Sequence, residues 1–234
     1  MKLTEYEKER YDRHLMLDEI GEAGQQKLKD AKVLVVGAGG LGSPVLLYLT
    51  SAGVGTIGII DDDVVSLSNL QRQVLYYEKD LGEAKVEKAK ERLLNTNPNT
   101  NIEIYRLRLS ESNVSDIFVG YDIIVDCTDN FKSRLLINKH SAQLSIPLVY
   151  GAVSPFEGQI TVFNLPGSID YNTLFPGLEK QEKVKNGIIT TLPGITGSIQ
   201  ANEVIKIILG KNGVLEGKLL VINVMSMTFD VLTI

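Results

Sequence analysis

The feature that most constrains the fold is a short β-branched run followed at once by a cluster of glycines. Residues 32–36 read Lys-Val-Leu-Val-Val and residues 37–42 read Gly-Ala-Gly-Gly-Leu-Gly, with Pro44 at a first-turn position of the apolar segment that follows. This order predicts a strand, a tight turn and a helix. Glycines let a backbone approach a phosphate, and a helix N-terminus supplies free N–H groups and a favourable dipole. The turn therefore predicts a nucleotide site, to which we assign Gly37, Gly39 and Gly40.

Strand-like and helix-like segments alternate after the glycine turn. Alternation of this kind implies right-handed crossovers and a mainly parallel sheet with helices on both faces, which is a Rossmann-like α/β fold. After Pro147 the pattern changes to strands with one strong helix, and it predicts an extension of the sheet by antiparallel strands in the C-terminal third. The predicted strands are Lys32–Val36, Thr56–Ile60, Ile102–Leu107, Ile123–Val125, Leu148–Val153, Gln159–Phe163, Leu219–Asn223 and Thr228–Leu232, and the helices after the turn are Lys85–Leu94, Lys132–Leu144 and Gly197–Leu209.

The length and composition predict one domain. The chain has 234 residues, of which 44% are hydrophobic and 23% charged, enough for one substantial core. We expect a single domain over 1–234, made of two short N-terminal helices in 1–30, a nucleotide-binding half over 31–147 and a second half over 148–234. The segment at about 164–187 is too long and too polar for a plain connection, so it is a candidate functional loop.

Charge and residue usage exclude several classes of function. The formal net charge is −5, whereas proteins that bind nucleic acid by its phosphate backbone are generally basic, so nucleic acid is not an expected partner. No stretch approaches a membrane span and the first residues lack an apolar signal-peptide core, so we expect a cytoplasmic protein without membrane contact. One cysteine, Cys127, and two histidines cannot form a closed four-ligand zinc site, so we expect no zinc.

A polar cluster after the second predicted strand distinguishes the predicted nucleotide site from that of a nicotinamide-dependent dehydrogenase. Asp61 ends the next predicted strand, at the position where a carboxylate accepts hydrogen bonds from ribose hydroxyls, and this alone would fit a dinucleotide. Just beyond it, Asn69, Arg72 and Gln73 crowd polar and cationic groups. A triphosphate needs such a cluster because an arginine fork can neutralise terminal phosphates and an amide can donate to bridging oxygens. The sequence therefore favours ATP.

A lysine and two aspartates complete the candidate site. Lys85 opens a predicted helix about one crossover later, where its ammonium could lie against the α-phosphate under attack by a nucleophile. The alternative is that Arg72 and Lys85 are solvated surface charges. Asp126 and Asp129 follow a strand at the carboxyl edge of the sheet, where a carboxylate can hold Mg²⁺ against phosphates. We assign the metal to Asp129 and leave Asp126 a structural role. Asn130 either contacts the nucleotide or caps the next helix.

Taken in order, the motifs resemble those of the MoeB/ThiF/HesA family, the bacterial relatives of ubiquitin-activating enzymes. The resemblance runs nearly end to end and is far more specific than one glycine motif. Its segments are Arg10-Tyr-Asp-Arg-His14, Gly37–Gly42, Asp61–Gln73, Gly82–Val86, Asp126–Asn130, Gly158–Val162 and Pro193–Gln200.

The resemblance implies an activity and a partner. It implies that the C-terminal glycine carboxylate of a small ubiquitin-like sulfur carrier ending in Gly-Gly attacks the α-phosphate of Mg-ATP, which gives an acyl-adenylate and pyrophosphate, with the carrier on the half formed by 148–234. Carried over by position, Gly40 and Asp61 hold the nucleoside, Asn69 and Arg72 the triphosphate, Lys85 the α-phosphate and Asp129 the magnesium. The residues between Asp61 and Gln73 that we add to the nucleotide site are Ser68, Leu70 and Gln71.

The family also implies an oligomer. Its members are homodimers in which an N-terminal arginine reaches into the partner's site, and Arg13 stands at that position in this sequence. Composition alone would place Arg13 as an exposed helix charge. We therefore predict a homodimer in which Arg13 acts in trans, as a catalytic residue beside Arg72, Lys85 and Asp129.

The sequence departs from the family at its cysteines. Where relatives have a zinc CxxC pair, this chain reads Asp170-Tyr-Asn-Thr-Leu-Phe-Pro176, and it reaches Ile234 without the second pair. Where relatives commonly place a reactive cysteine, it reads Glu182-Lys-Val-Lys-Asn-Gly-Ile188. We interpret Cys127 as a buried thiol at a strand end. No enzyme thioester is therefore expected, and the adenylate would pass to a separate sulfur donor protein.

Two further hypotheses remain open at this point. The missing cysteines could mark a different acceptor, so that the chain adenylates a small-molecule carboxylate or another non-carrier acceptor in cofactor biosynthesis. The chain could instead be an inactive scaffold or dimer partner, although none of the named ATP-site residues has been lost. The carboxylate, the pathway and the acceptor are not specified by the sequence.

Overall fold

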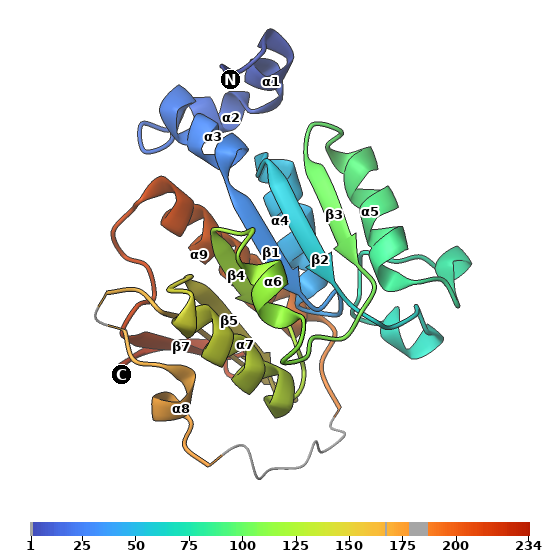
Figure 1. Ribbon diagram of the computed structural model, residues 1–234, viewed down its shortest axis with the longest axis vertical. Helices are drawn as coiled ribbons and strands as arrows, with labels where there is room; N and C mark the ends of the chain where they lie inside the picture. Colours follow the sequence, from blue (N-terminus) through green and yellow to red (C-terminus); the bar gives the residue numbers. More distant parts are fainter. Residues whose placement is uncertain (1, 167, 178–186) are drawn as a thin grey trace.

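The computed structural model describes residues 2–166, 168–177 and 187–234, which fold around one eight-stranded sheet (Figure 1). The strands lie in the order β3-β2-β1-β4-β5-β6-β7-β8. The first five pair in parallel, and β6, β7 and β8 extend the sheet by antiparallel pairing. Their bounds are β1 Lys32–Val36, β2 Thr56–Ile60, β3 Asn101–Tyr105, β4 Ile123–Asp126, β5 Leu148–Val153, β6 Glu157–Phe163, β7 Lys218–Asn223 and β8 Thr228–Thr233.

Helices cover both faces of this sheet, as the sequence predicts. One face carries α4 (Gly42–Ala52), α5 (Lys85–Thr96) and α9 (Thr191–Leu209), which pack on Val33, Val35 and their neighbours. The other face carries α6 (Val114–Phe118), α7 (Phe131–Gln143) and α8 (Tyr171–Leu174), which pack on Leu34, Val36 and their neighbours. Side chains of β1 are buried alternately on the two faces because parallel strands are covered on both sides. The mainly parallel Rossmann-like fold with an antiparallel C-terminal extension is confirmed.

The N-terminal segment differs from the two helices expected. It forms α1 (Glu5–Arg10), α2 (Asp12–Leu15) and α3 (Gly21–Asp30). A capping box between Thr4 and Glu7 starts α1. The helix α3 begins at Gly21, whose φ of 54° lies in the left-handed region that favours glycine. These helices lie beside the first residue of β1, at the amino ends of the parallel strands (Figure 1).

The position of the chain reversal locates the site. The chain leaves β1 towards β2 and β3, then returns to the other side of β1 as β4. In open α/β sheets such a switch point opens a crevice at the carboxyl ends of the strands, where ligands bind. The glycine turn follows β1 and the segment from Asp126 follows β4, so both lie at this edge. Among the described residues, none of the helices has the length and apolar character that a bilayer crossing needs.

The contact between α4 and α9 supports the glycine turn from behind and allows a test. A Cβ atom on Gly197 of α9 would lie 2.5 Å from the Leu41 carbonyl oxygen, whereas one on Gly194 would meet nothing within 4 Å. We predict that Gly197→Ala lowers the free energy of unfolding by about 1–3 kcal/mol, because α9 must shift away. Gly194→Ala in the same helix should be neutral or stabilise by up to about 1 kcal/mol. Urea denaturation measures both, and equal effects would contradict the packing described.

Candidate nucleotide-binding site

Two loops meet at the centre of the carboxyl edge with no room for a side chain between them. Gly37 has φ of +99°, and a Cβ atom placed on it would lie 2.7 Å from the carbonyl oxygen of Cys127. The Gly37 N–H donates to the Ile60 carbonyl oxygen at 2.8 Å. The glycine turn is thus held against the loop after β4 and the end of β2. Only glycine allows both this conformation and this approach.

Asp61 is fixed beside the turn by backbone donors. Its Oδ2 accepts the Ala38 N–H at 2.8 Å and its Oδ1 accepts the Asp63 N–H at 2.9 Å. Burial raises the pKa of this carboxyl, and the positive charge of Lys85 opposes the shift. An ionised carboxylate has about four lone-pair sites, so the two backbone bonds leave acceptors for hydroxyl donors. This geometry suits the predicted ribose contact.

Lys85 joins the same group and has a partner that sequence reasoning did not identify. It is the first residue of α5 and only 4% exposed, with its Nζ 2.9 Å from Oδ2 of Asp63. The Asp63 side chain is 70% exposed. A buried ammonium needs a counter-charge, and Asp63 supplies it. The alternative of a solvated surface charge therefore does not hold for Lys85, because its side chain is buried.

The polar segment after β2 brings Arg72 to the glycine turn. A Cβ atom on Gly40 would lie 3.5 Å from Cγ of Arg72 and 3.2 Å from Cβ of Pro193, so the turn, the arginine stem and the start of α9 converge. Arg72 Nη1 donates to the Ser68 carbonyl oxygen at 3.1 Å and lies 3.4 Å from Oε1 of Gln71. The other guanidinium nitrogens can face an anion.

Several amides of this segment make protein contacts. Oδ1 of Asn69 accepts the Ser66 N–H at 3.3 Å in the short helix η1 (Leu67–Asn69), and Gln71 Nε2 donates to the Ile188 carbonyl oxygen at 3.1 Å. Gln73 is 4% exposed, and among the described residues its Oε1 has no hydrogen-bond partner. An orphaned buried acceptor beside the turn is consistent with a ligand there. Nucleotide contacts of Ser68, Asn69, Leu70 and Gln71 stay predictions.

Tyr76 is a residue that sequence reasoning missed. Its hydroxyl donates to the Ala38 carbonyl oxygen at 2.7 Å, and its ring is buried. Ala38 is thereby held on both sides, because its N–H is bonded to Asp61. No local pattern marks Tyr76, since its partner is distant in the sequence.

The loop after β4 carries one buried carboxylate, Asp126, and one exposed carboxylate, Asp129. Asp126 is 1% exposed, and its Oδ1 accepts the N–H and the hydroxyl of Thr128 at 2.8 and 2.7 Å. Burial raises the pKa of Asp126. Asp129 is exposed at the mouth of the loop, where it can hold a cation. Asn130 caps α7 by accepting the Ser133 N–H at 2.9 Å, so the capping alternative is realised, and its nucleotide contact stays a prediction.

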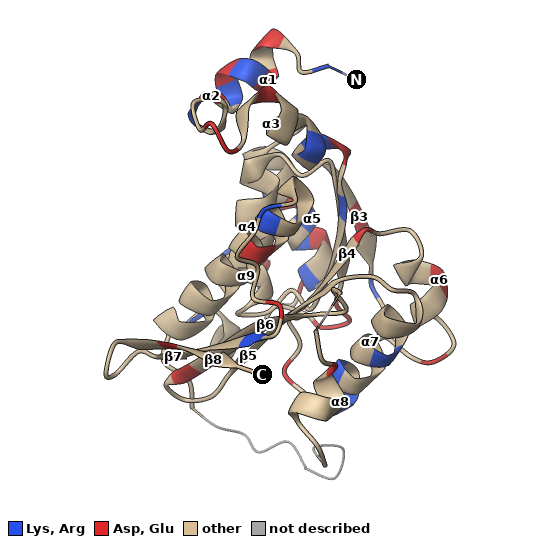
Figure 2. Cartoon of the chain, turned by 90° about the vertical axis from the view of Figure 1, so that its left-hand side faces the viewer, with Lys and Arg blue, Asp and Glu red and all other residues tan. Residues whose placement is uncertain are grey.

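Arg13 is not brought to this edge within the chain. It lies on α2, its side chain is 87% exposed, and its contacts are with Asp12 and Met16 of the same segment. The N-terminal helices and α8 lie at opposite ends of the molecule (Figure 2). Arg13 can therefore serve the site only from a second copy, and this role stays a prediction.

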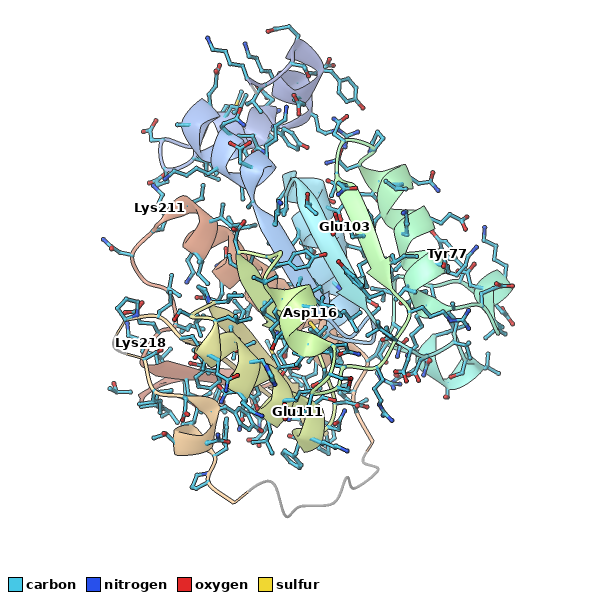
Figure 3. All side chains as sticks on the ribbon, in the orientation of Figure 1. Tyr77, Glu103, Glu111, Asp116, Lys211 and Lys218 are labelled. Atoms are coloured by element: carbon cyan, nitrogen blue, oxygen red, sulfur yellow. The ribbon has the colours of Figure 1, made fainter. Side chains whose placement is uncertain are left out.

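The predicted functional loop is described only in part. Its early portion contains α8, and Ile188 follows it, but residues 178–186, which include most of the segment 182–188 that the resemblance singled out, lie outside the described residues. A separate hollow of about 610 Å³ lies between α5 and the short helix η2 (Glu78–Asp80). Its labelled residue, Tyr77, lies beside α5 near the β3 edge of the sheet (Figure 3).

The fold and these contacts define a Rossmann-like α/β protein with a candidate nucleotide site at the carboxyl edge of its sheet. The ThiF family profile matches residues 11–234, and the chain belongs to the ThiF family. It is 44% identical over 237 residues to a probable molybdopterin-synthase adenylyltransferase of Porphyra purpurea, covering 98% of this chain and 62% of that protein. It is 42% identical to the SAMP-activating enzyme E1 of Haloferax volcanii, with 95% and 83% covered. A sulfur carrier protein adenylyltransferase of Thermus thermophilus is also 42% identical, with 100% and 90% covered.

Solved structures agree on the fold. The crystal structure of PaaA has a TM-score of 0.84 and 26% identity, covering 99% of this chain and 75% of that one. Escherichia coli MccB with ATP has a TM-score of 0.84 at 24% identity, covering 99% and 73%, and this likeness concerns the fold alone. The chain spans slightly less than two thirds of the Porphyra relative's length.

The single cysteine provides a test of the site's chemistry. Cys127 is 7% exposed, and burial raises the pKa of its thiol well above its usual value. Because the thiolate is the reactive form, we predict that the native chain resists DTNB at pH 8, whereas the urea-unfolded chain reacts with one equivalent. Absorbance at the released thionitrobenzoate band measures the rate. Rapid labelling of the native chain would show that Cys127 is a reactive thiol.

Proposed function

We propose that this chain uses ATP to adenylate the C-terminal carboxylate of a small ubiquitin-like sulfur-carrier protein. The observation that carries the proposal is the convergence of the glycine turn, the fixed carboxylate of Asp61 and the buried ammonium of Lys85 at one sheet edge. The names of the Haloferax and Thermus relatives support a carrier protein as the substrate. In the proposed reaction a carboxylate oxygen bonds to the α-phosphorus, the bond to the β-phosphate breaks and pyrophosphate leaves.

In the proposed reaction the acidic and basic residues of the site have different roles. Asp61 would accept hydrogen bonds from the ribose, and Gly37, Gly39 and Gly40 would leave space for the phosphates. The cations Arg72 and Lys85 would stabilise negative charge that grows on the phosphates as the bond breaks. Mg²⁺, held by Asp129, would supply further charge neutralisation on the phosphate oxygens. The chemistry of Asp129 fits this ion because Mg²⁺ prefers oxygen ligands and Asp129 offers an exposed carboxylate on the loop that lies against the glycine turn.

The proposal ends at the acyl-adenylate. The buried thiol of Cys127 is unsuited to an enzyme thioester, since burial keeps it protonated. A separate persulfide donor would then attack the activated carbonyl, which releases AMP. Cytoplasmic location and a site free of zinc are part of the same proposal.

Exchange of labelled pyrophosphate into ATP tests the function. The purified chain is mixed with ATP, Mg²⁺ and a carrier that ends in Gly-Gly, and a carrier lacking these two residues is the control. We expect exchange with the intact carrier alone. Exchange only with a small carboxylic acid would replace the carrier by a small-molecule substrate, and no exchange with any acid would favour a scaffold.

Single substitutions test the roles of the site residues. Lys85→Ala and Asp129→Ala should each lower exchange by about 10²–10³-fold, because each removes charge aimed at the phosphates. Cys127→Ala should keep most of the activity. Thermal unfolding confirms that each variant is folded. A folded but inactive Cys127→Ala variant would overturn the assignment of an adenylation step without a thiol.

The trans role of Arg13 is testable by mixing two inactive variants. In a homodimer of the predicted kind, Arg13→Ala and Lys85→Ala chains form heterodimers in which one of the two sites has both residues intact. We expect partial recovery of exchange, up to about a quarter of the wild-type rate if random pairing makes half of the dimers mixed. Differently tagged chains allow the heterodimer to be isolated. No recovery in isolated heterodimers would exclude the trans contact.

A further inference from the structure

The buried face of α7 carries a polar stripe that the proposed reaction does not use. Arg134, Asn138 and Ser141 are spaced by four and three residues, so they share one face of the helix. Their side chains are at most 8% exposed. Buried polar groups are costly unless they have partners. The partners of this stripe are therefore informative.

Asn138 and Ser141 fasten the segment that follows β6. Oδ1 of Asn138 accepts the N–H of Tyr171, the first residue of α8, at 3.2 Å. The Ser141 hydroxyl accepts from Nδ2 of Asn164 at 2.9 Å. The first contact joins α7 to α8, the second joins α7 to the residue that follows β6, and neither reaches the loop after β4.

Arg134 reaches that loop. Its Nη2 donates to the Thr128 carbonyl oxygen at 3.0 Å, and its guanidinium lies 5.6 Å from the ring centre of Tyr150 and 5.8 Å from that of Phe131. Burial opposes the charge of Arg134, but its neighbours Tyr150, Asp126 and Tyr171 together raise its pKa. A charge-assisted donor held between aromatic rings is well fixed.

Thr128 is consequently held from two sides. Asp126 accepts its N–H and its hydroxyl, and Arg134 donates to its carbonyl oxygen. The Thr128 carbonyl and the Asp129 N–H belong to one planar peptide group. Arg134 therefore fixes the plane from which the Asp129 side chain leaves the backbone. Asp129 itself is exposed at the mouth of the loop.

We infer that Arg134 is a positioning residue, which orients the Thr128–Asp129 peptide so that the Asp129 carboxylate is presented to the metal. The inference rests on the proposed function in so far as Asp129 is the metal ligand. Groups that orient a metal ligand typically change metal affinity by about 10–100-fold when they are replaced. An effect of that size on Asp129 would distinguish orientation from general packing.

The experiment measures metal binding rather than turnover. Electron paramagnetic resonance of free Mn²⁺ gives its affinity for the complex of the full chain with a non-hydrolysable ATP analogue. The variants are Arg134→Gln, Arg134→Lys and Asp129→Asn, and the matched control is Lys132→Gln, which removes an exposed charge from the same helix. Arg134→Lys keeps a charge near Asp126 but lacks the planar fork that reaches the carbonyl oxygen.

We expect both Arg134 variants to weaken Mn²⁺ binding by about 10–100-fold, while Lys132→Gln behaves as the wild type. The affinity for the ATP analogue in the absence of a divalent cation, measured by fluorescence, should stay within about twofold of the wild type. The reason is that Arg134 contacts the loop after β4 and not the glycine turn. Thermal unfolding identifies folded variants. If Arg134→Gln does not fold, Arg134→Lys decides the question.

Distinct results separate this inference from the proposed function. Wild-type Mn²⁺ affinity in folded Arg134→Lys, or an equal loss in Lys132→Gln, would overturn the positioning role. Wild-type affinity in Asp129→Asn would overturn it as well, even if the chain adenylates a carrier. The opposite result is also possible. If Mn²⁺ binding depends on Arg134 but no carboxylic acid supports pyrophosphate exchange, the positioning role is kept and the proposed function is rejected.

Discussion

The approach of the glycine turn to the loop after β4 is the constraint on which the rest of the site depends. With no side chain on Gly37, the turn lies against the Cys127 carbonyl, and Ala38 is placed where its N–H bonds to Asp61 and its carbonyl to Tyr76. A side chain at Gly37 would separate the loops and disturb all of these bonds. The carboxylate of Asp61 and the loop after β4 are thus both placed by the same close approach at the switch point of the sheet.

Charge at the site is balanced before any ligand arrives. Lys85 is neutralised by Asp63, and Asp126 has the charge of Arg134 nearby. The two pairs differ in exposure. The Asp63 side chain is 70% exposed, so water can solvate its carboxylate when a phosphate competes for the Lys85 ammonium. Asp126 and Arg134 are both buried, and their opposite charges attract each other there. The contact between Lys85 and Asp63 can therefore change when a ligand binds, whereas the buried charges of Asp126 and Arg134 hold the loop after β4 in place.

Sequence patterns predicted the local parts of this structure and failed where partners are distant. Strands with buried faces, the glycine turn and the antiparallel extension follow from periodicity and turn residues. The start of α9 was predicted at Gly197 and lies at Thr191, because Pro193 is tolerated in a first helical turn. The bonds of Tyr76 to Ala38 and of Arg134 to Thr128 have no sequence signature. Asp63 had a weak one, as part of an acidic run at the end of β2.

The same constraint explains why the one cysteine of the sequence is a poor candidate for covalent chemistry. Its backbone carbonyl faces Gly37, and its side chain points into the core on the α9 side, where Sγ lies 4.0 Å from Oε1 of Gln200. A small side chain is needed there, because Gln200 also bonds the Asp126 carbonyl oxygen and closes the space behind the loop. In the proposed reaction a sulfur nucleophile would approach from the open edge, where Asp129 is exposed, and Cys127 is buried behind that edge.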